Sequence, residues 1–122
     1  MAPCADPSRR PNITYVPGLK RYLLTVAHSK VGLPSSHKMG VFEAPALWGP
    51  WRTVYYVDNF LGMRGGWYLG VHFPIKWHSA DGRTLWASIN CHDNADPGSC
   101  GPYHDRFNLM RARLTVAGAA GS

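Results

Sequence analysis

Apolar and polar residues alternate in several short runs along this chain, which is the pattern of strands with one buried face. Residues 13–16 and 21–26 form two such runs, and the turn at Pro17-Gly18 between them predicts a hairpin. A third strand is expected over residues 38–44, and a fourth over residues 52–57, which are rich in β-branched and aromatic side chains. The first half therefore predicts four consecutive strands.

The same pattern returns in the second half. Strands are expected over residues 75–78 and 83–89, joined by a turn at Ala80-Asp81-Gly82, and Asp-Gly is a strong hairpin signal. A further strand is expected over residues 106–112, but no fourth strand follows it. A repeat of four strands and then three predicts an all-β chain of antiparallel β-propeller blades, about two in number. Two such blades could also repack or self-associate as a small sandwich, because isolated sheets expose edges and apolar faces.

Composition supports one small domain with many turns. The chain has 122 residues, of which 45% are hydrophobic and 16% charged, with 13 glycines and 10 prolines. We expect a single β domain over residues 12–116, between a flexible arm at residues 1–11 and a flexible tail at residues 117–122.

The charge pattern argues against a nucleic-acid partner, and the distribution of apolar residues argues against a membrane partner. Lys and Arg exceed Asp and Glu by 13 to 7, a net charge of +6, but the basic residues are scattered and no long basic run occurs. We therefore predict no nucleic-acid partner. No stretch reaches about 18 apolar residues, and the start of the chain lacks the apolar segment of a signal peptide, so no membrane partner and no export signal are predicted.

Three cysteines leave the redox state open. Cys91 and Cys100 flank a loop of turn-forming residues that could bring the two sulfurs together, and the alternative is two free thiols. A disulfide would imply an oxidising compartment and would leave Cys4 as an odd thiol.

Three stretches of the chain are unusual: residues 21–25, residues 40–56, and residues 76–86 together with 107–109. The middle one contains Ala-Pro-Ala-Leu-Trp-Gly-Pro-Trp and then a Thr-Val-Tyr strand. Together they resemble the C-terminal part of bacterial five-bladed propellers related to glycoside hydrolases, including families of unassigned function grouped with arabinan-cleaving enzymes. The resemblance covers roughly residues 12–116. It implies an extracellular or periplasmic location, a polysaccharide or oligosaccharide ligand, and either self-association or pairing with missing upstream blades.

Catalysis would need two carboxylates about 5 to 9.5 Å apart. The chain has one glutamate, Glu43, on an expected strand, and Asp58 follows the fourth expected strand at a turn. They are the catalytic candidates, and they would meet only across an assembled interface. A structural role for Glu43 and a turn cap at Asp58 are the alternatives. Whether the chain is an enzyme is left open, with glycoside hydrolase chemistry as the expectation if it is active.

Four residues are candidate substrate contacts: His28, Trp67, Tyr68 and His72. Aromatic rings stack on sugar faces, and His72 precedes an expected innermost strand, although hydrogen bonds within loops would also explain the histidines. Trp48 and Trp51 are interpreted as packing between blades, and Trp77 and Trp86 as core residues.

The functional hypotheses are hydrolysis or binding of polysaccharide, and alternatively a non-catalytic carbohydrate-binding or structural module. A metal site formed by His92, His104 and the aspartates between them is a third hypothesis, but the spacing matches no established ligand pattern, so neither a metal nor a cofactor is predicted.

Overall fold

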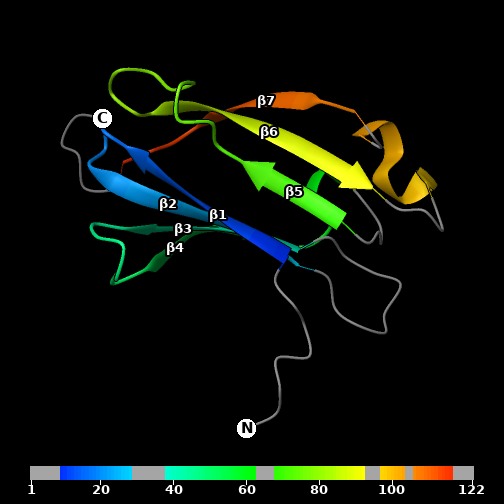
Figure 1. Cartoon of the computed structure of the whole chain (residues 1–122), viewed down its shortest axis with the longest axis horizontal. Helices are drawn as coiled ribbons and strands as arrows, with labels where there is room; N and C mark the ends of the chain where they lie inside the picture. Colours follow the sequence, from blue (N-terminus) through cyan, green and yellow to red (C-terminus); the bar gives the residue numbers. More distant parts are fainter. Residues whose placement is uncertain (1–8, 29–37, 63–67, 93–96, 104–105, 117–122) are drawn as a thin grey trace, which may run out of the picture.

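The computed structural model describes residues 9–28, 38–62, 68–92, 97–103 and 106–116. Their strands form two antiparallel sheets, which face each other as two layers (Figure 1). The N-terminal sheet has the order β1 (Arg9–Val16), β2 (Arg21–His28), β3 (Lys38–Ala44), β4 (Arg52–Val57), and the C-terminal sheet has the order β5 (Tyr68–His72), β6 (Thr84–His92), β7 (Asn108–Arg113). Two 3-10 segments, η1 (Phe60–Gly62) and η2 (Pro97–Tyr103), follow β4 and β6. The expected all-β fold is confirmed, with sheets of four and three strands, although β5 is not one of the strands that the sequence predicts.

One hydrophobic core lies between the two sheets. Because side chains alternate along a strand, every second residue of the central strands points inward. Leu23 of β2 and Leu85 of β6 are each only 1% exposed, and Val41 and Val71 are buried beside them. Burying each such side chain contributes about 1.5–3 kcal/mol, so this shared core is what holds the layers together.

The layers are closest where β1 and β2 meet β5. β5 is an edge strand, and side chains from the opposite sheet bond to carbonyls along its free edge. The buried hydroxyl of Thr14 donates to the Phe73 carbonyl at 2.7 Å, and that of Thr25 donates to the Val71 carbonyl at 2.7 Å. The Asn12 amide also donates to the Val71 carbonyl, at 3.3 Å. These bonds satisfy backbone groups that an uncovered edge would leave without protein partners.

The two turns of the sequence repeat pack against each other. A Cβ atom added at Gly18, in the first turn, would lie 2.4 Å from the backbone of Ala80 and of Asp81 in the second. Gly82 has a φ of +72°, and a Cβ there would lie 2.8 Å from side-chain atoms of Val16 and Leu19. Glycine is needed at both positions, because backbone approaches backbone at one and a left-handed turn is buried at the other.

The prediction of a strand at residues 75–78 is wrong. β6 pairs instead with β5, through a register that joins Val71 to Ile89. Residues 74–77 form a turn in which the Trp77 amide donates to the Pro74 carbonyl, and beyond it only an isolated bridge joins His78 to Leu85. Proline lacks an amide donor and fixes its φ, which favours a turn here over a regular ladder.

The other boundaries lie close to expectation. β1 begins at Arg9, so the last three residues of the expected arm at residues 1–11 belong to this strand. Residues 1–8 and 117–122 lie outside the described residues. Two facing sheets that approach most closely along one side are compatible with two partial blades.

Candidate functional site

The two catalytic candidates lie at opposite ends of β3. Glu43 forms an ion pair with Arg52 on the neighbouring strand, whereas Asp58 lies 3.6 Å from the ammonium group of Lys38. The stretch from Lys38 to Glu43 spans about 16 Å at the rise of an extended strand, well beyond the separation that glycoside hydrolysis requires. One chain therefore does not bring these carboxylates together. Their meeting across an interface between chains stays a prediction.

A groove of about 350 Å³ lies on the outer side of the C-terminal sheet. It crosses β5 and β6, with Asn12 of β1 on one side and Phe107, just before β7, on the other. Its lining comprises Asn12, Gly70, Val71, His72, Ser88, Ile89, Asn90 and Phe107. The groove thus combines segments from both halves of the chain.

The strand register explains which side chains face the groove. Val71 and Ile89 point into the core, so their neighbours in sequence point outward. Gly70 pairs with Asn90, and two residues further along β5, on the same outward face, His72 pairs with Ser88. Because glycine has no side chain, the position opposite Asn90 remains open. The result is a shallow floor bordered by an imidazole, a hydroxyl and a carboxamide, all groups that can donate and accept hydrogen bonds.

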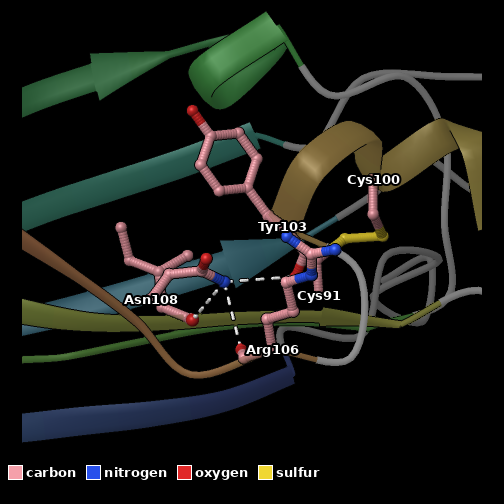
Figure 2. Close-up of a disulfide and its surroundings, with 6 residues drawn as sticks. Cys91, Cys100, Tyr103, Arg106 and Asn108 are labelled. Carbon is pink, nitrogen blue, oxygen red and sulfur yellow. Dashed lines mark hydrogen bonds between the residues drawn. A yellow bond between two sulfur atoms is a disulfide. The ribbon is translucent and has the colours of Figure 1, made fainter.

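Phe107 supplies an apolar ring at the rim of this floor, and the residue is 73% exposed. The next residue, Asn108, fixes the chain at this point. Its amide donates to the carbonyls of Ile89, Tyr103 and Arg106 at 3.1–3.2 Å, and Figure 2 shows these bonds converging on one side chain. The network ties the segment after η2 to β6.

A disulfide joins Cys91 to Cys100 beside this network (Figure 2). The Cα atoms are 5.8 Å apart, and both residues are buried in the core. The bond links the end of β6, next to Asn90, to η2. It resolves the alternative that the sequence left open.

The same face extends beyond the groove toward two tryptophans. The bridge between His78 and Leu85 places Trp77 opposite Trp86, and the Trp86 amide donates to the Trp77 carbonyl at 3.1 Å. Trp77 is 42% exposed, and Trp86 lies on the outward row of β6 because Leu85 and Ala87 point inward. The interpretation of both tryptophans as core residues is therefore wrong. The turn after Pro74 brings Trp77 alongside β6 without burying it.

The remaining candidates lie apart from the groove or cannot be placed. His28 ends β2 and Tyr68 begins β5, but their side chains are not among those described. Trp67 lies outside the described residues. Trp48, expected to pack between blades, is 88% exposed in the loop between β3 and β4.

Sequence reasoning found His72 and missed Ser88, Asn90 and Phe107. The alternation of Trp86, Ser88 and Asn90 along β6 was a signal that these three side chains share one face. Nothing in the local sequence placed Phe107 at the same groove as Asn90, because that arrangement depends on the pairing of β7 with β6.

The outer face of the N-terminal sheet is apolar. Ile13 and Tyr56 are each 49% exposed, and the rings of Tyr15 and Tyr22 lie 4.9 Å apart. Exposed apolar patches of this kind are typical of interaction surfaces. Self-association, or pairing with upstream blades, stays a prediction.

Within the described parts of the chain, no three His, Cys, Asp or Glu side chains are close enough together to hold a metal ion. The loop residues of the metal hypothesis, 93–96 and 104–105, lie outside those parts. No described helix has the length and apolar character needed to cross a membrane. Comparison of the chain with models of protein families, with curated proteins and with solved structures found no match in any of the three.

Proposed function

We propose that this chain binds polysaccharide through the groove on its C-terminal sheet and does not cleave it. The observation that carries the proposal is the combination of an exposed phenyl ring, Phe107, with the hydrogen-bonding side chains of His72 and Asn90 across an open glycine floor. A flat apolar ring suits the carbon-bound hydrogens of a sugar face, and planar polar side chains suit its hydroxyls.

The shape of the groove supports a chain-like ligand of modest affinity. It is a shallow surface of two strands whose outward row continues toward Trp86, so a glycan could enter and leave along it. A few hydrogen bonds and one stacking contact must also offset the loss of translational and rotational freedom on association, so the net binding free energy is only about 4 kcal/mol. This corresponds to a dissociation constant of about 1 mM for a short oligosaccharide.

Binding is favoured over hydrolysis because Glu43 and Asp58 are far apart and each is paired with a cation. A buried disulfide favours the extracellular or periplasmic location that the propeller resemblance implies, since such bonds persist in oxidising compartments. We retain that resemblance as part of the proposal.

The test separates loss of the site from loss of the fold. Gly70→Val adds a side chain to the outward row of β5, and valine suits a strand, so the variant should stay folded and lose binding. Phe107→Ala should weaken binding about fivefold or more on a glycan array and by titration calorimetry. Trp48→Ala is the matched control, because it removes another exposed ring that does not line the groove. Binding that depends on Trp48 and ignores both groove variants would refute the proposed site.

Hydrolysis is tested on the same glycans. We expect no release of reducing sugar by the parent chain over hours at high protein concentration. Release that disappears in both Glu43→Gln and Asp58→Asn, but not in Asp81→Asn, would replace binding with catalysis between chains.

A further inference from the structure

The groove continues into a positively charged strip on β7. Because Met110 and Ala112 pack against the core, Arg111 and Arg113 point to the outer side of the C-terminal sheet, and both are exposed. The register pairs Arg111 with Trp86, on the face that carries the groove. Directly opposed side chains on a sheet lie about 5 Å apart at Cβ, so a cation and an indole ring are neighbours there.

This strip is in line with the groove. Asn90 and Ser88 line the groove, Trp86 is the next outward residue of β6, and Thr84, paired with Arg113, is the one after it. From Asn90 to Thr84 the outward row spans about 20 Å at 3.3 Å per residue. A linear polymer lying in the groove along β6 therefore passes Trp86 and Arg111.

Described acidic residues do not offset this charge. Glu43 and Asp58 belong to the opposite sheet or its following turn, and they are paired with cations there. Asp81 lies in the turn before β6, where it accepts hydrogen bonds from the Ser79 hydroxyl and the Arg83 amide. In the described part of the chain, neither arginine of the strip forms an ion pair.

We propose that the polysaccharide bound by this face is acidic, with carboxylate groups on its sugars. This inference rests on the proposed function. A guanidinium group presents paired donors that match the two oxygens of a carboxylate, and such charge-assisted bonds are stronger than neutral ones. Trp86 beside Arg111 offers a ring for the sugar and a cation for its carboxylate at one position.

A nucleic acid fits this face less well. A protein that binds duplex DNA tightly can contact about six to ten phosphates through Lys and Arg side chains. This strip offers two arginines beside neutral polar groups. We therefore assign the strip to a uronate-type glycan.

The experiment compares polygalacturonate with its fully methyl-esterified form, which keeps the sugar and removes the charge. We expect the parent chain to bind polygalacturonate about tenfold more tightly, with affinity falling as salt rises. Arg111→Gln should weaken binding to polygalacturonate by about five- to tenfold and leave binding to the ester unchanged. Arg21→Gln, which removes a cation from the opposite sheet, is the matched control and should change neither.

The outcomes separate the two proposals. If the ester binds as tightly as the acid and Gly70→Val abolishes both, the groove binds neutral glycan and the acidic assignment is wrong. If Arg21→Gln weakens binding as much as Arg111→Gln, the attraction is unspecific and the strip is not a site. Tighter binding to duplex DNA, lost in Arg111→Gln, would also overturn the assignment. If neither glycan binds and Gly70→Val changes nothing, the proposed function itself fails.

Discussion

The threonine hydroxyls that join the two sheets allow a quantitative test of the fold. Thr14→Val and Thr25→Val keep the shape of each side chain and replace its hydroxyl group by a methyl group. Thr14 is 7% exposed and Thr25 is 2% exposed, so water has little access to the carbonyls that these hydroxyls satisfy. The two variants therefore measure what it costs to leave a buried backbone acceptor with fewer partners.

The structure predicts different magnitudes at the two positions. Thr14→Val removes the 2.7 Å bond to the Phe73 carbonyl and should lower the free energy of unfolding by about 1–3 kcal/mol. Thr25→Val should cost only about 0.5–1.5 kcal/mol, because the Val71 carbonyl keeps the Asn12 amide at 3.3 Å. Combining Thr25→Val with Asn12→Ala removes both donors, so the double variant should lose about 1 kcal/mol more than the two single losses added together.

Urea unfolding followed by tryptophan fluorescence, with the disulfide intact, gives the free energies of unfolding of the parent, the three single variants and the double variant. Thr53→Val is the control, because Thr53 is an exposed threonine on β4, and its stability should change by less than about 0.5 kcal/mol. A Thr14→Val variant as stable as the parent would refute the role of this hydroxyl. Strict additivity of Asn12→Ala and Thr25→Val would refute a shared acceptor at Val71.

Three further predictions concern the disulfide and the second turn. Replacing Cys91 and Cys100 by serine should lower the free energy of unfolding by about 2.5–3 kcal/mol, the loop-closure value for their separation of 9 residues. The same variant should bind glycan more weakly in calorimetry. Unchanged binding would mean that the disulfide does not position the groove. Gly82→Ala should cost about 2–4 kcal/mol in urea unfolding, because it combines a left-handed φ with overpacking, and a loss below 1 kcal/mol would contradict the buried turn. Hydrogen bonds from the Ser79 hydroxyl and the Arg83 amide lower the pKa of Asp81 below 3.8, so its contribution to stability is present above that pH and is lost as pH falls through the lowered value. Asp81→Asn should accordingly show a smaller drop in Tm between about pH 5 and about pH 2 than the parent, and identical drops would refute this role.

Local pattern determined much of the architecture from the sequence by itself. The strands at residues 21–26, 38–44 and 52–57 could be located because alternation and β-branched side chains act within a few residues. Pro17-Gly18 marked the first turn and Asp81-Gly82 the second for the same reason. The closeness of Cys91 and Cys100 was foreseeable from the turn-forming loop between them, although the bond itself was not.

Tertiary structure alone decided how the strands and the site come together. β6 could have paired with residues 75–78, but these residues form a turn after Pro74, and β6 pairs with β5 instead. The local sequence does not indicate which of the two pairings is more stable. The groove depends on contacts between distant segments, such as the bond from Asn12 to Val71 across 59 residues. The sequence indicated His72, but Phe107 lines the groove because β7 pairs with β6 and places the next residue, Asn108, opposite Ile89. Such contacts follow from burying two apolar sheet faces against each other, which is a property of the whole chain and not of any segment.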